Sequence, residues 1–212
     1  MHGVQVMNQL PRKTPKAIAR SQVQRARILD AAAKSFTAEG IHAASMATVA
    51  KTAGMSVGLI YRYFESKSDI VQALIEQEVE ETRIAFHEIG SSGELLDGIL
   101  DAFAPWRRAR AAGDTVNVAL AHEIIAEATR VPAIAEAMQR ADEAYREIFS
   151  EWIHDRALDQ GIELSPAQVR QRALLLHIMI DGLFARAILE AGLKRTTLKS
   201  ALRGLMQSLF TA

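Results

Sequence analysis

One short stretch of the chain, Gly54-Met55-Ser56-Val57-Gly58, has the G-x-S-x-G pattern that presents the nucleophilic serine of many hydrolases. That chemistry requires a strand before the serine and a helix after it. Here a short helical segment precedes Ser56, and the six histidines are scattered along the chain. One E-x-x-H pair, Glu151 and His154, falls short of the two such motifs that a di-iron bundle uses. We therefore predict no enzyme, no metal site and no cofactor.

The same stretch also fits two short helices joined by a sharp turn. Helical periodicity and capping residues predict a helix over 46–53 and another from Ser56 to about Phe64, with Gly54 at the turn. This is a helix-turn-helix, whose second helix lies in the major groove of DNA. Ser45 and Ser56 cap the two helices, and the amide groups at the second N-terminus favour a phosphate. The stretch therefore predicts DNA binding.

Residues Ala50–Lys67, AKTAGMSVGLIYRYFESK, resemble the DNA-binding signature of TetR/AcrR-type transcriptional repressors. The resemblance extends over about Arg25 to Leu74. It implies a ligand-responsive repressor that binds a palindromic operator as a homodimer and is released by a small-molecule inducer. It further implies that Tyr61, Tyr63 and Lys67 contact phosphates, and that positions 46–48, 57–59 and 62 face the groove.

The groove-facing positions offer few hydrogen bonds to bases. Val57, Ala47 and Leu59 can offer none, so we expect thymine-methyl contacts from Val57 and Ala47. Thr48 and Arg62 can hydrogen-bond, and we expect Arg62 to contact a guanine or a phosphate. A basic arm would reach a narrow minor groove through Arg12, Lys13, Lys16 and Arg20, or it is a tail without function. The predicted DNA-contact residues are Ser45, Ala47, Thr48, Ser56, Val57, Gly58, Leu59, Tyr61, Arg62, Tyr63 and Lys67.

The charges are unevenly distributed, although the chain is neutral overall with 25 basic and 25 acidic residues. Residues 1–68 carry ten Lys and Arg against three Asp and Glu, whereas residues 69–212 carry fifteen against twenty-two. A basic segment attracts a polyanion such as DNA, and an acidic remainder repels it. The alternative is a chance dipole across an ordinary helical protein.

The periodicity of almost every window indicates an all-α chain of about nine helices. We expect a disordered basic arm at 1–21, a three-helix DNA-binding domain at 22–67, and a helical ligand-binding and dimerisation domain at 68–212. The absence of cysteine, of a signal peptide and of a membrane-length apolar run fits a cytoplasmic protein. The predicted helices cover about 22–39, 46–53, 56–64, 68–89, 94–111, 115–129, 132–159, 166–192 and 194–210, with a break at Pro105.

Aromatic residues in the second domain predict an apolar inducer site with a polar anchor. Aromatic rings beside a carboxylate favour an apolar or cationic amphiphile. The alternative is that these rings form packed core, and that His177 and Asp181 bond each other across one helical turn. The predicted ligand-binding residues are Phe103, Trp106, Glu123, Tyr145, Phe149, Trp152 and Asp181.

The last two predicted helices are the candidate dimer interface. Apolar residues wrap nearly all round the helix at 166–192, which is more than one core can cover. Two such helix pairs make an isologous four-helix interface, and its two-fold symmetry predicts a palindromic operator. The predicted interface residues are Leu176, Ile180, Leu183, Phe184, Leu202, Leu205 and Leu209.

Two other functions fit parts of the sequence. A transcriptional activator of the same fold would share every feature above. A helical interaction module without DNA binding would account for the apolar surface, but not for the helix-turn-helix or the basic N-terminal part.

Overall fold

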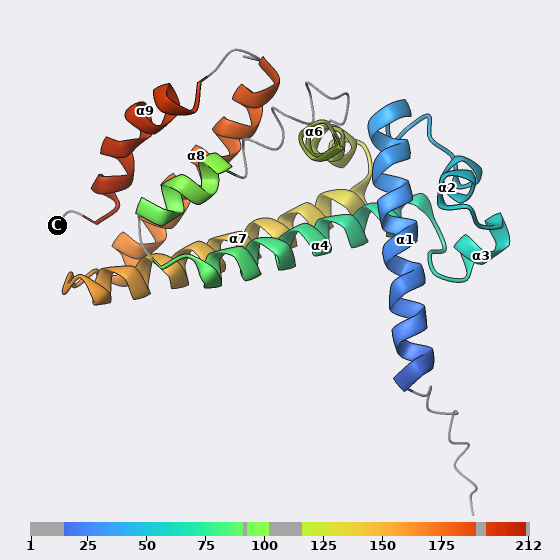
Figure 1. Cartoon of the computed structure of the whole chain (residues 1–212), viewed down its shortest axis with the longest axis horizontal. Helices are drawn as coiled ribbons and strands as arrows, with labels where there is room; N and C mark the ends of the chain where they lie inside the picture. The colour runs from blue at the N-terminus through green and yellow to red at the C-terminus, as the bar shows by residue number, and fades with distance from the viewer. Residues whose placement is uncertain (1–14, 91–92, 102–115, 190–193, 211–212) are drawn as a thin grey trace, which may run out of the picture.

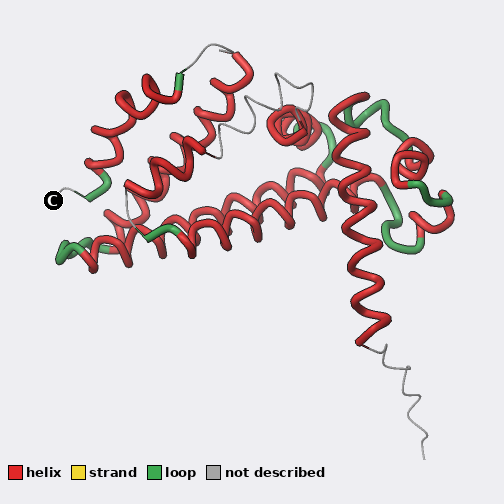
Figure 2. Tube along the Cα trace, in the orientation of Figure 1, coloured by secondary structure: helices red, strands yellow, loops and turns green. Residues whose placement is uncertain are grey.

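The computed structural model describes residues 15–90, 93–101, 116–189 and 194–210 of the chain. Within these ranges the chain is built of helices and loops and contains no strand (Figure 2), which confirms the predicted all-α class. Residues 93–101 also form a helical segment, which carries no label in Figure 1. The labelled helices are α1 (Pro15–Glu39), α2 (Met46–Ala53), α3 (Val57–Tyr61), α4 (Lys67–Glu88), α6 (Val116–Ala128), α7 (Pro132–Asp159), α8 (Pro166–Leu189) and α9 (Arg195–Ser208).

Most helices start and end close to the predicted positions, but α1 does not. It begins at Pro15, seven residues before the predicted start at residue 22, so the last part of the predicted arm is helical. Proline is well tolerated in the first turn of a helix, because the N–H that it lacks has no partner there. Residues 1–14, the rest of the predicted arm, lie outside the described residues. The same is true of Phe103, Pro105 and Trp106.

The helices form an elongated molecule with a head at one end (Figure 1). The head consists of α1, α2 and α3, and the N-terminal turns of α1 project beyond it. The body is built on α4 and α7, which lie side by side and run in the same direction away from the head. Helices α8 and α9 lie toward the far end of the body, and α6 lies at its near end, beside α1. This arrangement places α6 in contact with α1 on one side and with α7 and α8 on the other.

Two hydrophobic cores hold these elements together. The first core joins the head to α4, α6 and the start of α7, and includes Phe36, Ile41, Ile60, Ile70, Leu120, Ile124 and Ile134. The second core joins the end of α4 and residues 93–101 to α7, α8 and α9, and includes Phe86, Leu100, Phe149, Trp152, Leu176, Leu183 and Leu209. Val79 and Tyr145 pack against both cores. The head therefore shares its core with the body.

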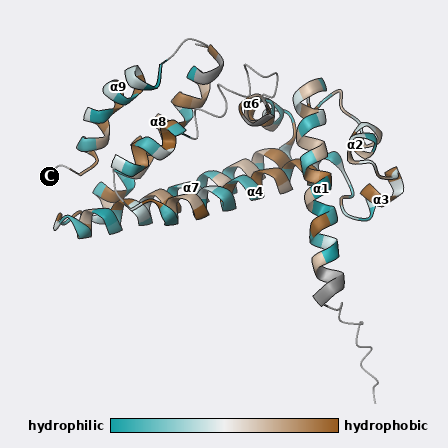
Figure 3. Cartoon of the chain, viewed as in Figure 1, coloured by the Kyte–Doolittle hydropathy of each residue, from teal (hydrophilic) through white to brown (hydrophobic). Residues whose placement is uncertain are grey.

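Apart from α8, the long helices carry polar and apolar residues on different faces, and their colours alternate in Figure 3. Such amphipathic helices bury one face in the core and leave the other to solvent. None of the described helices combines the length and the apolar composition that crossing a membrane requires.

Candidate nucleic-acid interface

Side-chain caps and one left-handed glycine fix the relative positions of α2 and α3. The Ser45 hydroxyl accepts a hydrogen bond from the Thr48 amide at 3.1 Å, and the Ser56 hydroxyl accepts one from the Leu59 amide at 3.3 Å. Gly54 between the two helices has a φ of 63°, a conformation that glycine adopts without strain. The two predicted caps and the predicted turn are therefore confirmed, and they define a helix-turn-helix.

The predicted groove-facing residues lie on the outer surface of this unit. Ala47, Val57 and Arg62 are exposed, and Thr48 and Leu59 are partly buried. Gly58 is exposed, and a Cβ added to it would have no atom within 4 Å. The packing of the head therefore does not require a glycine at this position, whose small size leaves room for another molecule.

The two predicted phosphate-binding tyrosines differ in their surroundings. Tyr61 is exposed, whereas Tyr63 is partly buried and packs against the first core. Tyr61 is the freer of the two to reach a phosphate, while the ring of Tyr63 also stabilises the head.

Lys67 links the start of α4 to the loop between α1 and α2. Its ammonium donates to the His42 carbonyl at 2.9 Å and to the Ala44 carbonyl at 3.0 Å. An ammonium has three N–H donors, so one remains for the phosphate contact that the sequence predicts.

Two arginines of α1 bind residues of the helix-turn-helix region, and neither role was predicted from the sequence. The Arg27 guanidinium donates to the Ala53 carbonyl at 3.0 Å, and Arg25 lies 4.8 Å from the centre of the Phe64 ring. A cation over an aromatic face is favourable. Each partner lies more than twenty residues away in sequence, so no local pattern indicates the contact.

A surface hollow lies beside the outer face of α2. Glu39, at the end of α1, lines it together with Ser45, Ala47, Thr48, Lys51 and Thr52. Three of these residues, Ser45, Ala47 and Thr48, belong to the predicted DNA-contact set. The hollow therefore coincides with part of the predicted contact surface.

The described aromatic residues of the predicted inducer site come together in the second core. The Tyr145 and Phe149 rings stack with centroids 6.1 Å apart, and Phe149 lies 4.7 Å from Phe86. The Trp152 indole donates to the Ile89 carbonyl at 2.9 Å. Phe149 and Trp152 are buried, which agrees with the alternative that these rings form packed core.

A polar group adjoins these rings around His177 of α8. Its Nδ1 lies 3.5 Å from the Asp142 carboxylate of α7, and its Nε2 lies 3.8 Å from the Asp181 carboxylate. Burial lowers the pKa of His177, although the negative charge of Asp181 partly opposes this shift. Burial also raises the pKa of Asp181 and that of Tyr145. The structure thus brings Asp181 together with Tyr145, but through a histidine that the predicted set lacked.

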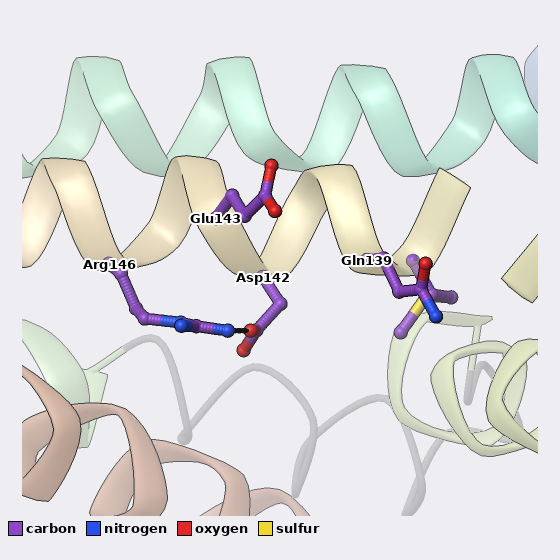
Figure 4. Close-up of a pocket in the computed structure, with 5 residues that line it drawn as sticks. Gln139, Asp142, Glu143 and Arg146 are labelled. Atoms are coloured by element: carbon purple, nitrogen blue, oxygen red, sulfur yellow. Dashed lines mark hydrogen bonds and ion pairs between the residues drawn. The ribbon is translucent and has the colours of Figure 1, made fainter. Parts of the chain in front are cut away.

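Next to this group, a surface hollow follows one side of α7 (Figure 4). Its lining residues are Met138, Gln139, Asp142, Glu143 and Arg146, and Asp142 is paired with Arg146. Glu123, the other predicted anchor, lies elsewhere, because its carboxylate accepts a hydrogen bond from the Ile41 amide at the head. No group of three His, Cys, Asp or Glu side chains suited to a metal ion occurs among the described residues.

The predicted dimer-interface residues divide between two faces of α8 and α9. Leu176, Leu183 and Leu209 are buried in the second core of their own chain, and Ile180, Phe184 and Leu202 are partly buried. Both faces of α8 are apolar, so the periodicity could not show which one meets the core. Among the side chains of α8 and α9 that the structure describes, the large apolar ones that remain exposed are Leu174, Leu175, Ile178, Leu189 and Leu205.

A capped helix-turn-helix on a basic head, joined to a helical body, defines a DNA-binding transcriptional regulator. Residues 28–74 match the TetR family of bacterial regulatory proteins, and residues 94–211 match the C-terminal region of BetI-type transcriptional repressors. The chain belongs to the TetR family.

Related proteins of known name agree with this assignment. UidR of Escherichia coli K12, an HTH-type transcriptional regulator, is 28% identical over 193 residues, covering 91% of this chain and 95% of UidR. The structure of Salmonella enterica GusR superposes with a TM-score of 0.71 at 26% identity, covering 90% of this chain and 96% of GusR. Bacillus subtilis FadR in complex with stearoyl-CoA shares the fold, with a TM-score of 0.64 at 19% identity over 88% and 97% of the two chains. The chain is a DNA-binding transcriptional regulator.

Proposed function

We propose that this regulator is a cytoplasmic repressor that binds a palindromic operator as a homodimer and leaves it when a small molecule binds the body. The observation that carries the proposal is the outer surface of the head, where two capped helices expose Val57, Arg62 and Tyr61 on a basic segment. A short helix presented in this way enters the major groove, and its basic surroundings bind the phosphates on either side.

The residues at this surface give the proposal a specific form of readout. Val57 and Ala47 contact thymine methyl groups, and Arg62 contributes the main hydrogen bonds to a base or phosphate. The phosphate backbone of the DNA is bound by Ser56 at the helix N-terminus, by Tyr61 and by the remaining N–H donor of Lys67. Because direct readout is sparse, DNA shape contributes much of the sequence preference.

Dimerisation follows from the exposed apolar face of α8 and α9. Leu174, Leu175 and Ile178 lie on neighbouring turns of α8, and Leu205 lies on α9. Exposed apolar side chains that gather on one face of a helix mark an interaction site, and a second copy of the chain offers the same face in return.

The side chains of the body favour an inducer that carries a positive charge or an aromatic group. Asp142 and Asp181 lie beside the Tyr145 and His177 rings, whose centroids are 5.4 Å apart. Carboxylates next to aromatic rings attract cationic amphiphiles. Asp142 also lines the hollow along α7, so the hollow borders this group.

DNA binding is tested by fluorescence anisotropy with the duplex that flanks the gene of this regulator, against a scrambled duplex and at two salt concentrations. We expect tight, salt-sensitive and sequence-preferring binding. Loss of a base contact by Arg62→Ala weakens operator binding by about 1–3 kcal/mol. The matched control is Arg140→Ala, which removes an exposed arginine of α7 outside the head. Equal binding of both variants contradicts the role of Arg62, and no preference by the wild type contradicts the proposed function.

Inducer binding is tested by adding a panel of cationic dyes and aromatic amines to the preformed DNA complex. We expect at least one member to lower the anisotropy and to change tryptophan fluorescence. Trp152→Phe and Trp106→Phe show which indole reports the binding. If apolar anions release the protein from DNA and cations do not, the proposed ligand class is wrong.

A further inference from the structure

The loop at residues 40–44, which joins α1 to α2, is held in place by the body. Gly40 ends α1 with a φ of 80°, and the Ile41 side chain is buried in the first core. The loop leads directly to Ser45, the cap of α2. Because α2 and α3 pack together as one helix-turn-helix, the position of this loop determines the position of the DNA-contact surface.

Two charged side chains hold the loop, and they come from different helices of the body. Lys67 of α4 donates to the carbonyls of His42 and Ala44. Glu123 of α6 accepts the hydrogen bond of the Ile41 amide, with 3.3 Å between Oε2 and the amide nitrogen. The same Oε2 lies 3.5 Å from the place where a Cβ of Gly40 would be, so the carboxylate rests directly against the backbone.

The rest of α6 links this contact to the other helices of the body. Leu120 and Ile124 flank Glu123 on the inner face of α6 and lie in the first core with the residues of the head. Glu127, one turn further, is buried and paired with Arg130 at 2.9 Å. Helix α6 also packs against α7 and α8, which carry the polar group around His177. A movement of α6 against α7 and α8 therefore displaces the carboxylate that holds Ile41.

We infer that Glu123 is a positioning residue for the DNA-binding head, and that it transmits the state of the body to the 40–44 loop through the Ile41 amide. This inference rests on the proposed function. It gives the body a connection to the head through α6, separate from the one that Lys67 provides through α4. It also replaces the predicted role of Glu123 as an anchor for the inducer.

The test compares Glu123→Ala, which removes the acceptor, with Glu123→Gln, whose amide oxygen can accept the same hydrogen bond. The matched control is Glu136→Ala, which removes an exposed carboxylate of α7. Two quantities are measured for each variant: hydrogen exchange of the 40–44 segment without DNA, and anisotropy of the operator duplex. Exchange of α8 and α9 in the same experiment shows whether the second core stays folded.

We expect Glu123→Ala to accelerate exchange at Ile41 and to weaken operator binding about 5-fold or more, the lower end of typical coupling between sites. Glu123→Gln restores most of both quantities, and Glu136→Ala changes neither. Unchanged exchange at Ile41 in Glu123→Ala overturns the inference, as does faster exchange with unaltered DNA affinity, or a Gln variant as defective as Ala. If the wild type lacks operator preference, the proposed function fails and the inference fails with it. If the wild type prefers the operator and Glu123→Ala binds it with the same affinity, the inference fails but the proposed function stands.

Discussion

Replacing Ile178 by lysine should weaken the dimer strongly and leave the fold of each chain intact. Ile178 is 57% exposed on α8 in the single chain. Burying a whole isoleucine side chain contributes about 1.5–3 kcal/mol, so burying this exposed part contributes about 0.9–1.7 kcal/mol. Each residue of a two-fold interface occurs twice, which raises the loss to roughly 1.7–3.4 kcal/mol. At about 1.4 kcal/mol for each factor of ten, the dimer dissociation constant should rise roughly 15- to 270-fold.

Sedimentation velocity across a concentration series measures this constant, and circular dichroism confirms that the variant is folded. The control is Val23→Lys, because Val23 is 58% exposed but lies on α1, away from α8 (Figure 1). The control should sediment as the wild type does. A folded Ile178→Lys variant with the dissociation constant of the wild type would refute the assignment of this face to the dimer.

A third variant distinguishes the two faces of α8. Leu176 belongs to the predicted interface but is buried in the second core. A buried, unpaired charge destabilises the fold itself, so Leu176→Lys should unfold the chain instead of producing a folded monomer. A folded, monomeric Leu176→Lys protein would show that the opposite face of α8 forms the interface.

Three further changes test the fold. Phe149→Ala removes a buried ring 4.7 Å from Phe86 and should lower the free energy of unfolding in urea by about 3–5 kcal/mol. Gly54→Ala meets no neighbouring atom but keeps a φ of 63°, so the same titration should show a loss of about 1–2 kcal/mol from backbone strain alone. The Lys199 hydrogen bond to Asp97 lowers the pKa of that carboxyl, so its stabilisation is present above the unfolded value of about 3.9 and is lost as the pH falls below it. Thermal melts at a series of pH values should therefore depend less on acid in Asp97→Asn; an unchanged profile would contradict the pairing.

Local signals in the sequence were sufficient to predict the helix-turn-helix. Ser45, Gly54 and Ser56 act within one or two turns of the chain, so capping rules alone give the bounds of α2 to the residue. The same holds for α7, which begins at Pro132 as predicted. The start of α1 at Pro15 was not predicted, because proline interrupts a helix in its interior but also begins one in its first turn.

Contacts between distant segments could not be predicted in this way. The hydrogen bond between Glu123 and Ile41 joins residues 82 positions apart, and nothing in the α6 sequence indicates its partner. Periodicity also fails where a helix is apolar on every side, as α8 is around Leu176 and Ile178. Only the packing of the folded chain shows which of these two residues faces its own core.

The shared first core bears on the construction of chimeric regulators. Exchanging heads between related proteins at residue 67, where α4 begins, divides the chain between modules but also separates Ile41 and Phe36 from Leu120, Ile124 and Ile134. A transplanted head then meets an unfamiliar α6 and loses complementary packing at that surface. A graft that keeps its native α6 and the first turns of α7 preserves the interlocking set, so the exchangeable module of this protein is discontinuous in sequence.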